Sequence, residues 1–280
     1  MQISFKNVSF SYIPIKYGSL AIKDINLSID ESDEFVAIIG ETGSGKSTLM
    51  MHMNALLFPS LGEVDILGKT IVPKKNKKVN IVRQKVGLVF QFPEYQLFED
   101  TVIKDVSYGP KNFDKNPDSV KEKSEKALNM VALNKKLWNR SPFSLSGGEM
   151  RRVAIAGTLA MDPKVLILDE PTRGLDPVGR QSIMTMFNNI HEETHKSIVL
   201  ITHDMDIVAE YAKRVVVLKD GKIVFDGKKE DLFALPSLEE YHIDYPSSIK
   251  IIKTINEELS LELPYKFKYQ ELVEMLSTIK

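Results

Sequence analysis

Cysteine is absent from the 280-residue chain, and neither sign of charge is in excess, because the formal net charge at pH 7 is −1. Without cysteine no disulfide framework can form, which fits a reducing compartment. Without a surplus of positive charge, no overall basic field favours nucleic acid, and we expect no nucleic-acid partner. Hydrophobic residues make up 43% of the chain and charged residues 27%, which is typical of a globular protein with a hydrophobic core.

Long apolar runs are absent as well. No run approaches the roughly 18 residues that a membrane-spanning helix needs. The opening residues MQISFKNVSFSY lack a basic region followed by an apolar stretch, so we expect no secretory signal. These absences predict a soluble, cytoplasmic protein that could still dock on a membrane protein.

Five short apolar runs rich in β-branched residues indicate the central sheet. They lie at residues 35–39, 86–90, 165–168, 198–201 and 215–218. Continuous runs of this kind, separated by helical stretches, favour parallel strands covered on both faces. Residues 2–12 and 21–29 instead alternate between apolar and polar, which predicts an antiparallel sheet with one wet face.

The rest of the chain predicts smaller features. Residues 222–225 are expected to pair with the fifth run as a hairpin. Residues 228–280 contain three prolines and short amphipathic pieces, so we interpret them as a small helical extension. The basic run at residues 74–78 is interpreted as a solvated loop, with contact to an anionic headgroup as the alternative.

A glycine-rich segment that follows the first apolar run organises the chain. Its pattern GxxxxGK[ST] is met by Gly40, Gly45, Lys46 and Ser47. The glycines let successive N–H groups point at one centre, and the new helix adds its positive end, so the segment predicts a polyphosphate cradle. Lys46 can reach the β- and γ-phosphates, and the Ser47 hydroxyl can ligate Mg²⁺. A glycine-rich turn that binds nothing is the alternative. The predicted nucleotide-binding residues are Gly40, Glu41, Thr42, Gly43, Ser44, Gly45, Lys46, Ser47 and Thr48.

Polar residues follow three of the other apolar runs, at the edge where ligands of parallel sheets collect. We expect Asp169 to hold Mg²⁺, mostly through water, and Glu170 to act as the general base for the attacking water. Gln91 could offer its amide oxygen to the metal, and His203 could donate to the γ-phosphate. Two solvated acids, an ordinary glutamine and a structural histidine are the alternatives.

A second anion-binding helix start follows in the segment LSGGE. Ser146 has the character of a helix cap, and Gly147, Gly148 and Glu149 open an apolar-periodic helix. One nucleotide site does not obviously need two such elements, so this one could serve the nucleotide of another subunit; a simply capped helix is the alternative. Tyr12 ends the first alternating strand, and its ring could stack on adenine or belong to the core.

The motifs GETGSGKST, Gln91, LSGGE, VLILDEPT, Gly174-Leu175-Asp176 and His203 stand in the order of ABC transporter ATPases, which the chain resembles over about residues 1–227. The segments VGLVFQFPEYQLF and DVSYGPKN resemble a narrower group, the energy-coupling factor (ECF) ATPases of cobalt and vitamin import. Within that group the chain is most similar to the second of two paralogous subunits.

The resemblance implies an α/β fold: a P-loop NTPase (RecA-like) parallel-sheet core with an antiparallel β subdomain, a helical signature subdomain at about residues 92–160, and a small C-terminal helical extension. Residues 1–227 would form the ATPase domain and residues 228–280 the extension. The implied cofactors are ATP and Mg²⁺, and the implied reaction is ATP hydrolysis.

The resemblance also implies a head-to-tail dimer with a paralogous ECF ATPase. In it, Ser146, Gly147 and Gly148 would touch nucleotide held by the partner, and Asp176 would lie in a loop that communicates across the dimer. The other implied partners are a transmembrane coupling subunit and a substrate-binding membrane subunit, so the chain would work as a peripheral protein on the cytoplasmic face of the cell membrane.

Residues 92–99 combine aromatic and acidic side chains, namely Phe92, Glu94, Tyr95, Phe98 and Glu99. Such a patch suits a partner helix with basic residues, so we predict that it receives a cytoplasmic helix of the coupling subunit; local core packing is the alternative. By family analogy, we expect residues 249–276 to pack against the tail of the partner ATPase.

Two residues depart from the wider family pattern. Glu149 replaces the commoner glutamine of the signature, which fits the ECF branch. Arg173 stands where a small residue is usual, so it either alters the packing of the dimer-facing loop or is simply solvated.

Other functions compete with transport. A chromosome-organising ATPase would need a long coiled coil between the phosphate loop and the signature, but only about a hundred residues without sustained heptads lie there. A translation-associated ABC protein would carry two phosphate loops, whereas one is present. A nucleotide-regulated scaffold without turnover is the third possibility, and Glu170 and His203 argue against it. Another kind of ABC transporter is the alternative within the family.

Overall fold

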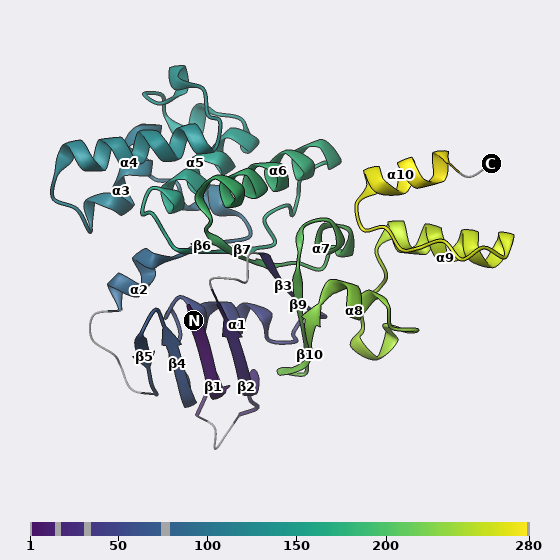
Figure 1. The fold of residues 1–280 in the computed structure, drawn as a ribbon. Helices are drawn as coiled ribbons and strands as arrows, with labels where there is room; N and C mark the ends of the chain where they lie inside the picture. The colour runs from purple at the N-terminus through teal and green to yellow at the C-terminus, as the bar shows by residue number, and fades with distance from the viewer. Residues whose placement is uncertain (1, 15–17, 31–34, 74–78, 279–280) are drawn as a thin grey trace.

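The computed structural model describes residues 2–14, 18–30, 35–73 and 79–278. The basic run at residues 74–78 lies outside these ranges, so its interpretation as a solvated loop stays a prediction. Figure 1 shows two sheets, with the helices α3 to α5 gathered at one end of the molecule and α9 and α10 at the other.

The larger sheet has six strands in the order β10-β9-β3-β8-β7-β6. All neighbours are parallel except β9 and β10, which form the expected antiparallel hairpin. This confirms the predicted parallel core. The strands are β3 (Phe35–Ile39), β6 (Val86–Val89), β7 (Val165–Asp169), β8 (Ser197–Ile201), β9 (Arg214–Lys219) and β10 (Lys222–Lys228).

Strand β3 explains why the apolar runs are continuous rather than alternating. Val36 and Ile38 face the core that this sheet shares with the smaller sheet, whereas Ala37 and Ile39 face the opposite side. Both faces are covered, so every position of the strand is buried. Because β3, β6, β7 and β8 run parallel, the residues that follow them meet at one edge of the sheet.

The smaller sheet is antiparallel, with strands in the order β2-β1-β4-β5. The two alternating segments at the start of the chain therefore form strands as predicted. The four strands are β1 (Ile3–Phe10), β2 (Ile22–Ile29), β4 (Leu61–Ile66) and β5 (Lys69–Ile71).

Helices cover the sheets in three groups. Beside the larger sheet lie α1 (Lys46–Met53), α2 (Asn80–Lys85), α6 (Pro177–Thr194) and α7 (Met205–Tyr211). The group around the signature contains η1 (Pro93–Gln96), α3 (Val102–Lys111), α4 (Pro117–Met130), η2 (Lys135–Leu137), η3 (Pro142–Ser144) and α5 (Gly147–Leu159). The end of the chain contains α8 (Lys229–Phe233), η4 (Glu239–Tyr241), α9 (Ser247–Leu259) and α10 (Tyr269–Ser277). Within the described ranges, no helix combines the length and apolar character needed to cross a bilayer.

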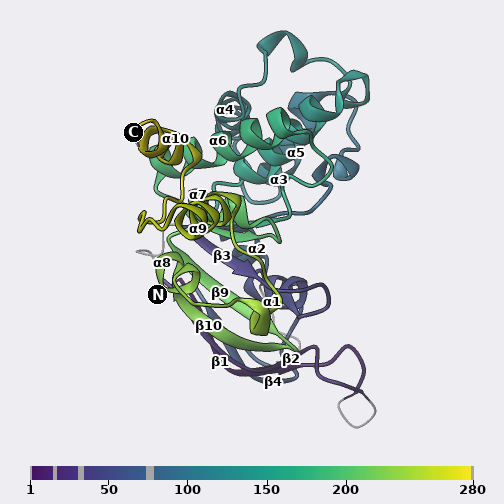
Figure 2. The same cartoon turned by 90° about the vertical axis from the view of Figure 1, so that its right-hand side faces the viewer.

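The first part of the C-terminal extension shares a core with the larger sheet. Leu232, Phe233, Leu238 and Ile249 are buried in one cluster with α7, β3 and β9. In Figure 2, α9 lies beside α7, and the two helices are in contact. By contrast, α10 buries only Leu272 among its residues. The extension is therefore anchored at its start and largely exposed at its end.

Candidate nucleotide-binding site

The phosphate loop between β3 and α1 needs glycine for steric reasons. Gly40 and Gly45 have φ angles of +141° and +104°, in the left-handed region. A Cβ atom at Gly40 would lie 2.1 Å from the carbonyl oxygen of Leu218, and one at Gly45 would lie 2.7 Å from that of Ala21. Both positions therefore exclude a side chain, and the backbone turns tightly enough to open α1 beside the end of β3.

Lys46 is the first residue of α1, and its ammonium turns back over the loop. Its Nζ atom donates to the carbonyl oxygens of Gly40 and Glu41, at 2.8 Å each. Burial lowers the pKa of Lys46, while the carboxylates of Glu170 and Asp169 partly oppose this effect. The loop borders a pocket of about 390 Å³ lined by Tyr12, Ala21, Thr42, Gly43, Gly45, Lys46, Ser47, Thr48, Gln91, Asp169, Glu170, Arg173 and Ile201.

Asp169 ends β7 in this pocket. Its pKa is raised to about 6, because burial and the neighbouring Glu170 outweigh the opposing effect of Lys46 and Arg173. The Ser47 hydroxyl and the Gln91 amide belong to the same pocket. Oxygen donors beside a buried carboxylate are what a hard divalent cation prefers, so the predicted donor set fits Mg²⁺.

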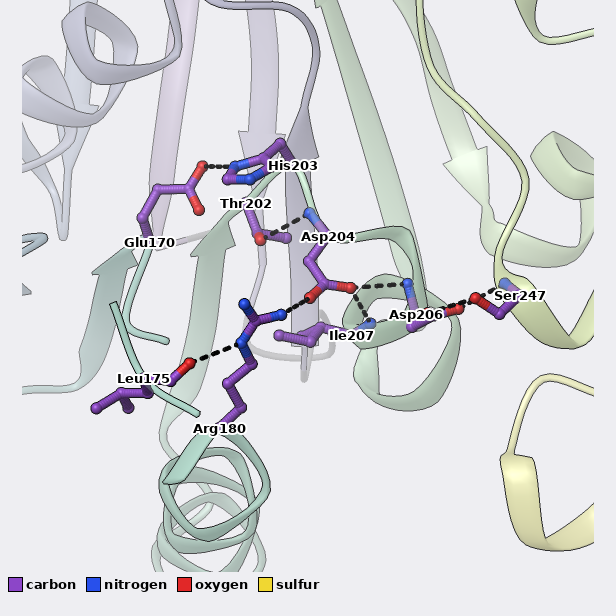
Figure 3. Close-up of polar contacts among 9 residues, drawn as sticks. All are labelled: Glu170, Leu175, Arg180, Thr202, His203, Asp204, Asp206, Ile207 and Ser247. Carbon is purple, nitrogen blue, oxygen red and sulfur yellow. Dashed lines mark hydrogen bonds and ion pairs between the residues drawn. The ribbon is translucent and has the colours of Figure 1, made fainter. Parts of the chain in front are cut away.

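Glu170 is held in a strained backbone conformation next to His203. Its φ angle is +48°, which is uncommon for a residue with a side chain, and its N–H donates to the carbonyl oxygen of Ile201 on β8 at 2.9 Å. His203 Nδ1 and Glu170 Oε1 are 2.7 Å apart (Figure 3). Two residues assigned separately from the sequence, 33 positions apart, are thus one hydrogen-bonded pair.

Gln91 bonds to a residue for which the sequence predicted no role in the pocket. Its amide oxygen accepts from Arg173 Nε at 2.8 Å and also from Nη1. Arg173 is therefore bonded to Gln91 in the pocket rather than simply solvated. Its guanidinium lies near enough to Asp169 to lower the pKa of that carboxyl. The metal-ligand role of Gln91 stays a prediction.

Tyr12 lies at the rim of the pocket. Its side chain is 63% exposed, and its hydroxyl is 3.0 Å from Thr48 Oγ1. The ring packs edge-on against Phe10, with 5.0 Å between centroids. This is an exposed aromatic ring anchored at its hydroxyl end, which suits adenine stacking, and the stacking itself stays a prediction.

The signature lies on α5, outside this pocket. Ser146 caps the helix by accepting from the Glu149 N–H at 3.4 Å, and the Glu149 carboxylate accepts from the Ser146 N–H at 2.9 Å. Around Gly147 and Gly148, a Cβ atom would meet nothing within 4 Å. The predicted cap is confirmed, and its glycine backbone faces open space. Asp176 caps α6, where its carboxylate accepts from the Gly179 N–H at 2.6 Å.

The structure departs from the predicted docking patch at Glu94. Its carboxylate is bound inside the chain by Arg151, with Nη2 to Oε1 at 2.9 Å, and the two side chains are only 14% and 4% exposed. Glu94 thus faces a buried arginine of α5 rather than solvent. Tyr95 and Phe98 are 83% and 57% exposed, as a docking surface requires, and Phe92 is 36% exposed.

Arg151 is the structural residue that sequence reasoning missed. It also donates to the carbonyl oxygens of Pro171 and Arg173, which follow β7. It therefore joins the signature helix, the segment after Gln91 and the segment after Glu170. The only sequence feature that could have indicated this role is its position two residues after Glu149. That spacing does not distinguish Arg151 from the neighbouring Arg152.

The parallel sheet, the phosphate loop at the start of α1 and the acidic pair at the end of β7 define a P-loop ATPase. The chain belongs to the ABC transporter family, whose model matches residues 22–173.

Named relatives support a narrower comparison. The energy-coupling factor transporter ATP-binding protein EcfA2 of Ligilactobacillus salivarius is 46% identical over 95% of this chain and 94% of its own length. The protein of the same name from Bacillus subtilis is 49% identical over 88% of this chain and 89% of its own.

Solved structures agree in fold. The cbiO1 protein of Clostridium perfringens, part of the ABC transporter complex cbiONQ, matches with a TM-score of 0.76 and 35% identity over 92% of this chain and 95% of its own. The ATP-binding cassette MJ0796, a dimer in a post-hydrolysis state with ADP and Pi, matches with a TM-score of 0.71 and 31% identity over 81% of this chain and 98% of its own.

Proposed function

We propose that this chain is the ATP-hydrolysing subunit of an ECF-type ABC importer, working as a peripheral protein on the cytoplasmic face of the membrane. The observation that carries the proposal is the separation of two anion-binding elements within one chain. The phosphate loop opens into the pocket, whereas the signature glycines face open space elsewhere. A second ATPase can therefore bring its signature to this pocket.

ATP binding would close such a dimer from both sides. The γ-phosphate contacts Lys46 and the phosphate loop of this chain, and helix-start N–H groups of the partner reach the same phosphate. Conversely, Ser146, Gly147 and Gly148 of this chain serve the partner's nucleotide. Hydrolysis removes the shared phosphate, and the dimer relaxes.

The chemistry at the closed site needs little covalent participation by the protein. Glu170 accepts the proton of the attacking water, and the oxygen of that water attacks the γ-phosphorus as the bond to ADP breaks. The His203 ring is hydrogen-bonded to Glu170 through Nδ1 and lies at the γ-phosphate in the closed site. Ser47, Gln91 and Asp169 would hold Mg²⁺, Asp169 mostly through water, and the cation would supply charge neutralisation at the phosphate oxygens.

The proposed partners are those that the resemblance to ECF ATPases implies, and a similar protein described as part of an ABC transporter complex supports them. The ATPase partner would be a paralogous ECF subunit, so the dimer is a heterodimer. A transmembrane coupling subunit would rest on the surface that includes Phe92, Tyr95, Phe98 and Glu99, and a further membrane subunit would bind the vitamin or metal ion. Glu94 supports this surface from beneath through Arg151 rather than contacting the partner.

The decisive experiment is Glu170→Gln in the purified transporter complex. We expect ATP affinity to be retained while phosphate release falls by about 10²- to 10⁴-fold, because the amide cannot accept the proton. Glu257→Gln, at an exposed position of α9, is the matched control and should keep the wild-type rate. A near-normal rate for Glu170→Gln would show that the base is another group. If the chain purified from membranes carries no integral membrane partner, the transport function is wrong.

A further inference from the structure

The C-terminal extension is hydrogen-bonded to α7, the helix that follows His203. The Asp206 carboxylate, in the first turn of α7, accepts from the Ser247 N–H at 2.6 Å and from the Ser247 hydroxyl at 2.8 Å (Figure 3). Ser247 is the first residue of α9. The Asp206 carboxylate of α7 thus accepts from both the backbone N–H and the hydroxyl of Ser247, which lies 41 positions later on α9.

The short segment between His203 and Asp206 is held by hydrogen bonds on both sides. Asp204 caps α7 by accepting from the N–H groups of Asp206 and Ile207, at 3.1 and 3.2 Å. Thr202 Oγ1 accepts from the Asp204 N–H at 3.1 Å. His203 stands between these bonded residues, and its own side chain is 71% exposed. The imidazole is therefore placed by these backbone bonds and by its own hydrogen bond to Glu170, rather than by packing around the ring.

The same segment is bonded to the loop that carries Asp176. Arg180 Nη1 lies 3.4 Å from Asp204 Oδ2, and Arg180 Nε donates to the carbonyl oxygen of Leu175 at 3.1 Å. Figure 3 shows the Glu170–His203 bond, the Asp204 contacts and the Asp206–Ser247 bonds side by side, joined through the backbone of residues 202–206. The position of the extension is thus linked to the dimer-facing loop as well as to His203.

Helix α7 and the extension share a core. Met205 and Val208 of α7 are buried in one cluster with Leu238 and Ile249 of the extension. A shift of α9 would therefore carry the start of α7, and His203 with it, rather than slide past it.

A second contact joins the extension to the phosphate loop. His242 Nδ1 lies 3.0 Å from Glu41 Oε2, and this hydrogen bond lowers the pKa of Glu41. Lys219 Nζ donates to the carbonyl oxygen of Glu240 at 2.6 Å. Residues 239–247 thus contact the phosphate loop through His242 and helix α7 through Ser247.

We propose that Asp206 and Ser247 are positioning residues for ATP hydrolysis: through them the C-terminal extension sets the placement of His203 at the γ-phosphate within the same chain. The extension then does more than contact a partner, because its position is coupled to the catalytic pair Glu170–His203. This inference rests on the proposed ATPase function.

The test is Ser247→Pro in the purified transporter complex. Proline removes both donors of Ser247, yet it is tolerated at the first position of a helix, and the preceding residue is already extended with ψ 149°. We expect kcat to fall at least fivefold, with KM for ATP changed by less than twofold. Asp206→Ala should give the same result, and the double variant should be no slower than either single variant, because all three remove one contact.

Two further variants separate positioning from folding. Ser247→Thr keeps both donors and should restore the wild-type kcat. Asp244→Asn removes a different ion pair of the extension, the one with Lys250, and should leave kcat unchanged. The urea midpoint of each variant is measured alongside.

Either of two results would overturn the inference. In the first, Ser247→Pro hydrolyses ATP at the wild-type rate; in the second, the losses of Ser247→Pro and Asp206→Ala multiply in the double variant. If the wild-type complex itself releases no phosphate, the proposed function fails instead, so the two failures are distinguishable.

Discussion

At the scale of single residues, burying the Asp169 carboxylate in the pocket lowers the stability of the folded protein at neutral pH. Asp169 is half-buried beside Glu170, and its pKa is raised to about 6. Since the ordinary value is 3.8, the folded chain binds this proton more tightly than the unfolded chain does. The stability that Asp169 contributes is therefore fully present below about pH 4 and is lost as the pH rises through about 6.

Asp169→Asn should therefore stabilise the nucleotide-free protein while removing its ATPase activity. We expect the free energy of unfolding at pH 7.5 to rise by about 1 kcal/mol, a shift of about two pKa units discounted for partial solvent exposure. Urea unfolding at pH 4.5 and 7.5 measures this, and the gain should shrink at the lower pH. Asp100→Asn, at an exposed side chain, is the control. A variant that is less stable at pH 7.5 would contradict the assignment of Asp169 as an unfavourably buried charge.

At the scale of elements, Arg151 connects three segments that reach the site from different parts of the chain. Its guanidinium binds Glu94 on η1 and two carbonyl oxygens after β7, and its side chain is 4% exposed. A buried pair of this kind adds little net stability over a well-packed apolar pair, but removing one member leaves the other charge buried and unpaired.

Arg151→Met should accordingly destabilise the protein by about 3 kcal/mol, measured as the free energy of unfolding in urea. The surface pair of Lys104 and Asp100 is the matched control, because both side chains are more than half exposed. Lys104→Met should change stability by less than about 0.5 kcal/mol. If the double variant Arg151→Met, Glu94→Met is as unstable as Arg151→Met alone, the unpaired carboxylate is not the cause.

The sequence predicted the elements of the site well because each motif is local. Strand, turn and helix start are contiguous around Lys46, and the parallel order of β3, β8, β7 and β6 brings the other motif residues to one edge. Contacts between distant segments were not predictable. Glu94 and Arg151 are 57 positions apart, and Glu41 and His242 are 201 apart. The sequence shows the charge of Glu94 but not that Arg151 lies buried beneath it, so it predicted Glu94 as a residue of the docking surface.

At the scale of the whole molecule, the exposed aromatics after Gln91 form the surface proposed to carry the membrane partner. Tyr95→Ser combined with Phe98→Ser should weaken co-purification of the coupling subunit at least about tenfold, because the apolar contact is lost. ATP affinity of the isolated chain should be unchanged. Val224→Ser, at an exposed aliphatic side chain of β10, is the control. Retention of the coupling subunit by the double variant would place the docking surface elsewhere.

Helix α10, at the far end of the extension, presents apolar side chains that no described residue of this chain covers. Tyr269 and Val273 are 66% and 48% exposed. If this face packs on the tail of the partner ATPase, Val273→Lys should weaken nucleotide-free dimerisation at least about tenfold, because a charge would be buried there. Dimer closure with ATP should persist, since it depends on the phosphate loop and the signature. Thr254→Lys adds the same charge at an exposed polar position of α9 and should not change the dimerisation constant in analytical ultracentrifugation. An equal constant for Val273→Lys and Thr254→Lys would mean that the two tails do not meet through α10.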